Sequence, residues 1–194
     1  MDFAYGISAI DTGFHRPRFD ASHLIVEDGH AVFIDVGTNY SIPFLLAELE
    51  AKGIARDKVD YVIVTHVHLD HAGGAGEMLR HLPIARLAVH PRGAPHMINP
   101  ARLVASASSV YGAEEVQRTY GELVPVAAER VIEIRDEAVI EFAGRRLRCL
   151  DTPGHARHHF SVWDERSRSF FSGDTFGLSY REFDTDKGAF ILPT

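Results

Sequence analysis

Short apolar runs dominate the first part of the chain. Residues 3–10, 22–28 and 31–36 are rich in Ile, Val and Phe, and this pattern predicts three strands. The second and third of these runs are joined at Asp28-Gly29, a dipeptide that favours a tight turn. The first part of the chain is therefore expected to begin a β-sheet.

The chain after the third predicted strand shows the apolar spacing of a helix. A helix is predicted to begin at Asn39 or Ser41, either of which could cap it, and to end near Lys52. Pro43 suits its first turn and Gly53 its end. Its apolar positions at helical spacing are Phe44, Leu45 and Leu49. Further along, strands are predicted at 59–64 and 84–89, and helices at 75–82 and 114–123.

The last third of the chain is predicted to form a series of strands. They are predicted at 131–135, 138–142, 145–150, 159–164 and 168–172. Strands, then helices, then more strands are typical of a layered α/β fold. No repeat, linker or low-complexity segment interrupts the 194 residues, so residues 1–194 are expected to form a single domain.

The most informative segment is Thr65-His-Val-His-Leu-Asp-His-Ala-Gly-Gly74, directly after the predicted strand 59–64. Residues two apart in an extended stretch point to one side, so His66 and His68 can face a single metal ion. Asp70 and His71 lie beyond the bend and would point toward a second ion nearby. Imidazole nitrogen combined with carboxylate oxygen suits zinc, iron or manganese better than calcium or magnesium.

Two later segments repeat the layout of strand, tight turn and candidate ligand. Asp151-Thr-Pro-Gly-His155 presents a histidine after a Pro-Gly turn, and Ser172-Gly-Asp174 presents a carboxylate after a glycine. Either residue alone would more often be an ordinary loop residue. After the first cluster, we expect His155 to be the third histidine and Asp174 to be a bridging ligand.

Together these motifs resemble the metallo-β-lactamase superfamily, and most closely its glyoxalase II-like branch of metal-dependent hydrolases. The resemblance covers roughly residues 22 to 177 and includes an aspartate that ends an early strand, Phe33-Ile-Asp35. It implies an αβ/βα four-layer sandwich, with two mostly antiparallel sheets face to face and helices outside. It is specific for the fold and the metals and weakly specific for the substrate.

The resemblance also implies the ligand sets. The first metal would take His66, His68 and His155; the second would take Asp70 and His71, and Asp174 would bridge the two. Asp35 would brace the ligand loop through hydrogen bonds, although a turn former before Gly37 is another reading. His158 and His159 follow the His155 turn, and one of them could hydrogen-bond near the metals or simply pack.

The sequence departs from the family at its end. The family supplies a seventh ligand, a histidine beyond the bridging aspartate, but no histidine follows His159 here. Gly188 to Thr194 include an apolar run that resembles part of an element rather than a tail. We therefore expect the C-terminal half of the sandwich to be incomplete and the second metal position to be weaker than the first. We expect the chain either to self-associate through that half or to be only marginally stable.

The expected chemistry is hydrolysis. Two divalent ions, zinc being favoured over iron or manganese, would share a water and lower its pKa so that a metal-bridging hydroxide attacks a small ester, thioester, lactone or related substrate. Asp70 is expected to be the catalytic proton acceptor and donor as well as a ligand. Two alternatives stay open: a mononuclear iron oxidoreductase of the persulfide dioxygenase type, using His66, His155 and Asp174, and a catalytically weak relative that keeps the fold.

The amino-acid composition limits the classes of partner that the protein is expected to bind. The net charge is −7 with histidines neutral and no run of Lys or Arg exists beyond Arg145-Arg146, which argues against a nucleic-acid surface. No apolar stretch approaches 18 residues and no signal peptide is recognisable at Met1, so we expect no membrane association and a cytoplasmic protein. The single cysteine, Cys149, cannot form an internal disulfide and is expected to be a buried strand residue.

Overall fold

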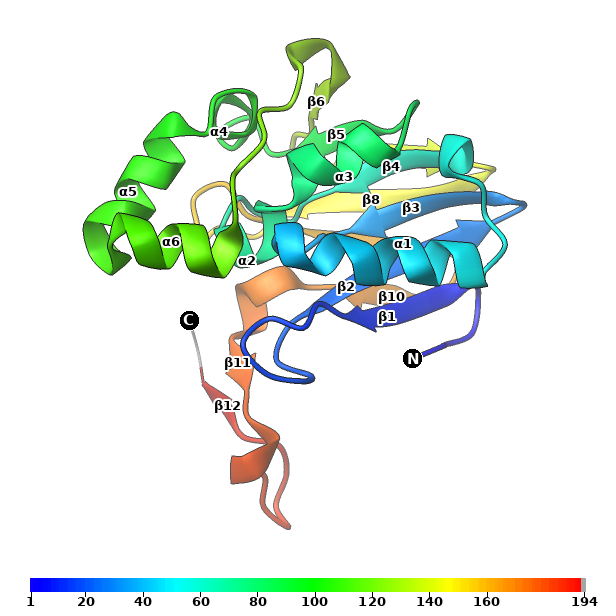
Figure 1. Cartoon of the computed structure of the whole chain (residues 1–194). Helices are drawn as coiled ribbons and strands as arrows, with labels where there is room; N and C mark the ends of the chain where they lie inside the picture. Colours follow the sequence, from blue (N-terminus) through cyan, green and yellow to red (C-terminus); the bar gives the residue numbers. More distant parts are fainter. Residues whose placement is uncertain (193–194) are drawn as a thin grey trace.

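Six strands form the first sheet of the computed structural model, which describes residues 1–192 (Figure 1). Their order in the sheet follows the chain, and their bounds are β1 Ile7–Asp11, β2 Ala21–Glu27, β3 His30–Ile34, β4 Val59–Ile63, β5 Arg86–Val89 and β6 Val131–Glu133. β1, β2 and β3 pair antiparallel, whereas β3 to β6 pair parallel. The expectation of a mostly antiparallel first sheet was therefore wrong, because the connections after β3, β4 and β5 contain helices, and helical crossovers return the chain in the same direction.

The α-helices occupy the stretch between β3 and β6. Their bounds are α1 Ile42–Ala51, α2 Leu69–Ala72, α3 Ala75–His81, α4 Ala94–Ile98, α5 Ala101–Tyr111 and α6 Ala113–Tyr120. Figure 1 shows α1 and α3 on the same face of the first sheet. Leu45 of α1 and Met78 of α3 are fully buried in the same apolar cluster as Phe33 of β3. This cluster is the first of two cores.

Two details of the first helix differ from the expectation. A 3₁₀ turn at Asn39–Ser41 precedes α1, and Thr38 caps it through a hydrogen bond from the Tyr40 backbone N–H to Thr38 Oγ1. Ser41, the N-cap of α1, makes no capping hydrogen bond with its side chain. Phe44 is 52% exposed, and Ile42 takes its place on the buried face.

Four antiparallel strands form the second sheet, in the order β10-β9-β8-β7. Their bounds are β7 Val139–Phe142, β8 Arg145–Asp151, β9 Phe160–Asp164 and β10 Ser169–Phe171. The inner face of this sheet packs on the first sheet, where Leu147, Cys149 and Phe160 lie in one buried cluster with residues of β2 to β5. Cys149 is buried in a strand, as predicted. The layers are thus helix, sheet and sheet, and no α-helix follows Tyr120 within residues 1–192.

A buried arginine joins the two sheets at one end of the second core. The Arg145 side chain is fully buried and forms an ion pair with Asp164, which is also buried. Its guanidinium donates to the Tyr5 carbonyl at 2.6 Å and lies 3.3 Å from a carboxylate oxygen of Glu27 on β2. Burial of this charge is tolerated because every side of the guanidinium meets an acceptor.

The rest of the described chain adds little to the cores. A 3₁₀ turn at Gly173–Phe176 leads to β11 Leu178–Ser179, which pairs with β12 Ile191–Leu192. The apolar run near the end therefore forms a short strand, with Ile191 and Leu192 54% and 46% exposed, and residues 193–194 lie outside the described part. α4 and α5 were not predicted, and α5 buries none of its residues. No helix within residues 1–192 is long and apolar enough to cross a membrane.

Candidate metal centre

The candidate ligands gather where β3 and β4 end side by side. Residues Asp35 and Thr65 follow these neighbouring parallel strands, and the Asp35 backbone N–H donates to the Ile63 carbonyl at 2.8 Å. Carboxyl ends of parallel strands meet at one edge of a sheet, which is where open α/β sheets commonly bind ligands. The second sheet reaches the same edge, since the Phe160 N–H donates to the Thr65 carbonyl at 2.9 Å.

Three histidines converge on one point of this edge. One ring nitrogen from each of His66, His68 and His155 lies within 4.8 Å of the others, a spacing that can surround one ion. His155 Nε2 and His68 Nδ1 are 2.8 Å apart. His66 is fully buried, and its Nε2 has no hydrogen-bond partner among the described residues. A buried nitrogen without a partner is costly unless it coordinates something, so this donor set fits a metal ion.

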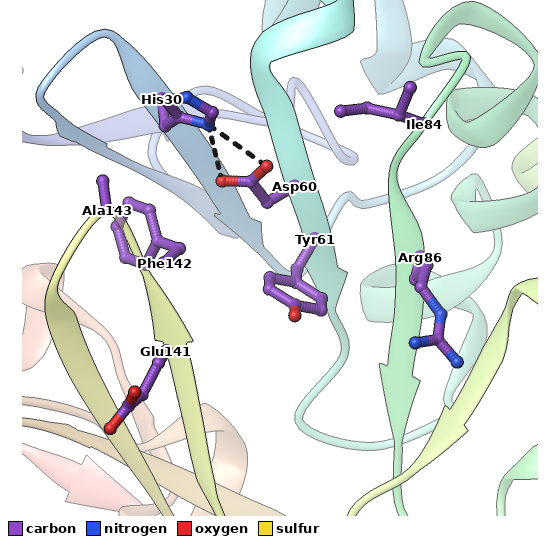
Figure 2. Close-up of a pocket in the computed structure, with 8 residues that line it drawn as sticks. All are labelled: His30, Asp60, Tyr61, Ile84, Arg86, Glu141, Phe142 and Ala143. Carbon is purple, nitrogen blue, oxygen red and sulfur yellow. Dashed lines mark hydrogen bonds and ion pairs between the residues drawn. The ribbon is translucent and has the colours of Figure 1, made fainter.

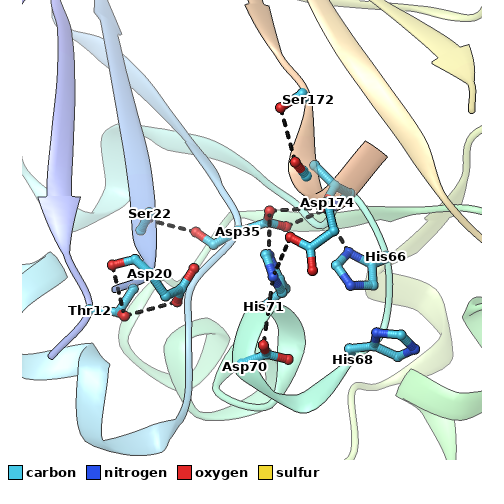
Figure 3. A network of polar contacts seen from close by, with 12 residues as sticks. Thr12, Asp20, Ser22, Asp35, His66, His68, Asp70, His71, Ser172 and Asp174 are labelled. Atoms are coloured by element: carbon cyan, nitrogen blue, oxygen red, sulfur yellow. Dashed lines mark hydrogen bonds and ion pairs between the residues drawn. The ribbon is translucent and has the colours of Figure 1, made fainter. Parts of the chain in front are cut away.

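A second group shares His66 with the first. Ligand atoms of His66, His71 and Asp174 also lie within 4.8 Å of one another. Asp174 Oδ1 is 3.2 Å from His71 Nε2, and Asp174 Oδ2 is 3.4 Å from His155 Nε2. Figure 3 shows the Asp174 carboxylate pointing toward His71 and His66. Its two oxygens therefore face the two groups, which is the position a bridging ligand needs.

Asp70 lies at the rim of this cluster. Its Oδ2 is 3.8 Å from His71 Nε2, and its side chain is 33% exposed. Asp70 belongs to neither three-residue group. It is thus close to the second group and open to solvent, and its catalytic role stays a prediction.

The electrostatic surroundings of the two groups differ. Burial, reinforced by the neighbouring histidines, lowers the pKa of His66 far below its usual value, so its ring is neutral and able to donate a lone pair. Burial also disfavours the charged form of His71, but hydrogen bonds to Asp174 and Asp35 outweigh it and raise the pKa of His71 well above 6.5. Carboxylates that stabilise a proton on His71 also favour a cation in the same place.

Asp35 makes the bracing hydrogen bonds expected of it. The Thr65 backbone N–H donates to Asp35 Oδ1 and the Thr65 hydroxyl donates to Oδ2, both at 2.8 Å. His71 Nδ1 lies 3.0 Å from Asp35 Oδ2. His71 Nε2 faces the Asp174 carboxylate at 3.2 Å, so both ring nitrogens of His71 lie beside an acceptor. A metal ion bound at Nε2 would leave the proton on Nδ1, where Asp35 accepts it. Asp35 has φ +54°, a left-handed conformation that aspartate and asparagine tolerate better than most residues.

Two further residues lie near the cluster, and only one of them, His159, was named from the sequence. Asp20, in the loop between β1 and β2, accepts a hydrogen bond from the Thr12 hydroxyl at 2.8 Å, and burial raises its pKa to about 6 (Figure 3). His159 is 1% exposed and accepts a hydrogen bond from the Asp174 backbone N–H. Asp20 carries no motif that could reveal it, whereas His159 follows the His155 turn and was left open between hydrogen bonding and packing.

A surface hollow at the other end of the sheets includes none of these residues. It has a volume of about 400 Å³ and is lined by residues that begin β3 and β5 and by the β7–β8 turn (Figure 2). The His30 ring pairs with Asp60 at 2.9 Å inside it. β3, β4 and β5 start at this hollow and end toward the histidine cluster, so the two sites are separated by the length of the strands.

The sandwich of two sheets and the histidine–aspartate cluster at its edge define a metal-binding α/β protein. The model of the metallo-beta-lactamase superfamily matches residues 15–191, and the chain belongs to this superfamily.

Individual relatives agree with this assignment. The chain is 30% identical over 180 residues to the metallo-beta-lactamase fold-containing protein ST1585 of Sulfurisphaera tokodaii, covering 90% of this chain and 64% of that one. The solved structure of ST1585 from Sulfolobus tokodaii superposes with a TM-score of 0.73 at 28% identity, over 98% of this chain and 69% of that one. A hydroxyacylglutathione hydrolase of Synechococcus sp. is 30% identical over 131 residues, which are 67% of this chain and 37% of the enzyme. The chain thus spans less than two thirds of the length of these two curated relatives.

Proposed function

We propose that this protein is a metal-dependent hydrolase that cleaves an ester, thioester or lactone bond in a small molecule. The observation that carries the proposal is the convergence of His66, His68 and His155 on one point, with a buried His66 Nε2 that has no partner among the described residues. The Synechococcus relative is a hydroxyacylglutathione hydrolase, which supports the same reaction class.

In this proposal the cluster holds two divalent ions. His66, His68 and His155 hold the first, Asp70 and His71 hold the second, and Asp174 lies between them. Nitrogen donors with two carboxylates favour zinc, and iron or manganese are compatible with the same set. When bound, such ions supply hydroxide at neutral pH and polarise a carbonyl oxygen.

The protein's own residues orient the ions and move the proton. Asp35 fixes the His71 tautomer with its Nδ1 hydrogen bond, so that Nε2 is free to coordinate. Asp70, at the solvent-exposed rim, accepts a proton and returns it to the leaving group. The net charge of −7 favours a small substrate over a nucleic acid.

Elemental analysis of protein purified without added metal tests the proposal, together with a screen of ester, thioester, lactone and phosphodiester substrates. We expect divalent metal in the wild type, turnover of an acyl substrate, and loss of both in His66→Gln. His30→Gln is the matched control, because His30 makes a similar carboxylate pair in the distant hollow. One iron per chain with oxygen consumption would support the iron oxidoreductase instead. Bound metal without turnover would support a catalytically weak relative that keeps the fold. Either result refutes the proposed hydrolase.

A further inference from the structure

His159 is a buried residue that touches several parts of the candidate centre without being one of its proposed ligands. It lies just before β9, while Thr152 follows β8 and Asp174 follows β10. Its Nδ1 is 2.8 Å from the Thr152 hydroxyl, and its Nε2 is 3.2 Å from the Asp174 backbone nitrogen. Its ring centre is 5.0 Å from that of His66.

The donors and acceptors around His159 fix the direction of each hydrogen bond. The Asp174 backbone N–H can only donate, so Nε2 accepts and the single proton of the neutral ring is on Nδ1. Nδ1 then donates to the Thr152 hydroxyl, with the Thr175 hydroxyl as a second neighbour at 3.2 Å. Both ring nitrogens are therefore engaged by the protein.

The direction of the hydrogen bonds beyond Thr152 can be assigned in the same way. The Ser161 hydroxyl donates to the Ser172 carbonyl at 3.1 Å, so its proton is used there. The Thr152 hydroxyl, 3.0 Å from Ser161 Oγ, must then be the donor in that pair. The hydrogen bonds run from the Asp174 N–H through His159, Thr152 and Ser161 to the Ser172 carbonyl. We name this set the His159 hydrogen-bond network; it begins and ends on the turn that carries Asp174.

The turn also packs directly on His159. Gly173 has φ +52°, and a Cβ atom there would lie 2.6 Å from His159 Nε2 and 2.7 Å from Thr65 Oγ1. No side chain fits in that space. Thr65 is the residue held by Asp35, so the Asp174 turn is positioned against the ligand loop of the first sheet as well as against its own sheet.

We infer that His159 is a positioning residue that holds the Asp174 carboxylate at its place between the two histidine groups. The inference rests on the proposed metal-binding function. The bridging position requires one carboxylate to stay within reach of His71 at 3.2 Å and of His155 at 3.4 Å. His71 lies in α2, which follows β4 of the first sheet, and His155 lies in the loop after β8 of the second sheet. The His159 hydrogen-bond network connects that loop to the Asp174 turn. Supports of this kind typically change metal affinity 10–100-fold when removed.

Cobalt titration of the full chain, followed by visible absorption, tests the inference. His159→Leu fills the space but offers no acceptor, and we expect it to lower the affinity for the ions that Asp174 would bridge by 10–100-fold and to change the absorption bands. His159→Gln places an amide oxygen near the position of Nε2, and we expect it to recover most of that affinity. His23→Leu is the control, because the His23 ring lies 5.1 Å from that of Phe171 and His23 belongs to neither three-residue group.

A second variant covers the case in which His159→Leu does not fold. Ser161→Ala removes only the hydroxyl that donates to the Ser172 carbonyl, and we expect a several-fold loss of affinity in the same direction. The inference is overturned if the folded His159→Leu protein binds cobalt with wild-type affinity. Where that protein does not fold, wild-type affinity in Ser161→Ala overturns it. So would equal losses in the Leu and Gln variants. A wild-type chain that binds no cobalt would instead refute the proposed function, so the two failures are distinguishable.

Discussion

Asp35→Asn separates the role of charge at the cluster from the role of shape. Asparagine has the same outline and tolerates φ +54°, so the backbone after β3 is retained. Its oxygen can still accept from the Thr65 backbone N–H, which lies 2.8 Å away. Its NH₂ group, however, must occupy the place of Oδ2 and face His71 Nδ1, 3.0 Å away. Two donors cannot face each other, so His71 must give up the proton on Nδ1.

The magnitude follows from this exchange of tautomers. With Nδ1 accepting, the His71 proton moves to Nε2, and a protonated nitrogen cannot coordinate a metal. We expect the affinity for the ion held by His71 to fall 10–100-fold, or about 1.4–2.7 kcal/mol. Hydrogen bonds to a charged group contribute about 1.5–3 kcal/mol against about 1 for neutral ones, so the metal-free protein should lose about 0.5–2 kcal/mol of unfolding free energy for the weakened bond.

Competition with a chromophoric chelator measures the affinities, and urea unfolding with excess chelator measures the stability. Asp60→Asn is the matched control, since Asp60 also accepts from a histidine Nδ1, at 2.9 Å, but is partly exposed in the distant hollow. The reasoning is refuted if Asp35→Asn binds both ions as tightly as the wild type, or if Asp60→Asn weakens them equally.

Four other predictions test separate parts of the structure. Gly173→Ala should cost at least about 2 kcal/mol in urea unfolding, because alanine is strained at φ +52° and its Cβ would meet His159 and Thr65; an unchanged midpoint would contradict this. Arg145→Met should cost about 3–5 kcal/mol by leaving Asp164 buried and unpaired. Burial raises the pKa of Asp164 but hydrogen bonds from Arg145 and Ser167 lower it below 3.8 overall, so the wild type should lose stability as the pH falls below about 4, and Arg145→Met should show a smaller acid slope. Zinc at 100 times its dissociation constant should add about 2.7 kcal/mol to the unfolding free energy, and excess chelator should remove it. Asp70→Asn should lower turnover about 10²–10⁴-fold while cobalt binding by His66, His68 and His155 stays close to normal; near-normal turnover would exclude Asp70 as the proton carrier.

Local patterns predicted the strands and the first ligand cluster well. Strands 59–64 and 145–150 match β4 and β8 within a residue because each is a compact run of apolar or alternating residues. His66 and His68 were recognisable because two residues separated by one position share a side in extended backbone. The helices α4 and α5 were missed, since Pro95 and the serine-rich stretch around Ser106 obscure helical spacing.

Contacts between distant segments were harder to predict. Nothing local to His159 reveals that Asp174, 15 positions later, donates to its ring. The same holds for Asp20, whose raised pKa depends on burial by the folded chain. Helical spacing grouped Phe44 with Leu45 and Leu49, but Phe44 is 52% exposed and Ile42 lies on the buried face instead. The parallel pairing of β3 to β6 likewise depends on crossovers rather than on the strands themselves.

The lack of buried residues in α5 has a consequence for hydrogen exchange. Its backbone amides are protected by its own helical hydrogen bonds and by packing on α6, which itself buries only Val116. Segments with so little burial open locally at a small fraction of the global unfolding free energy. Amides of α5 and α6 should therefore exchange with deuterium as one early unit, while those of β3 and β4, between the two cores, should exchange only when the whole domain unfolds.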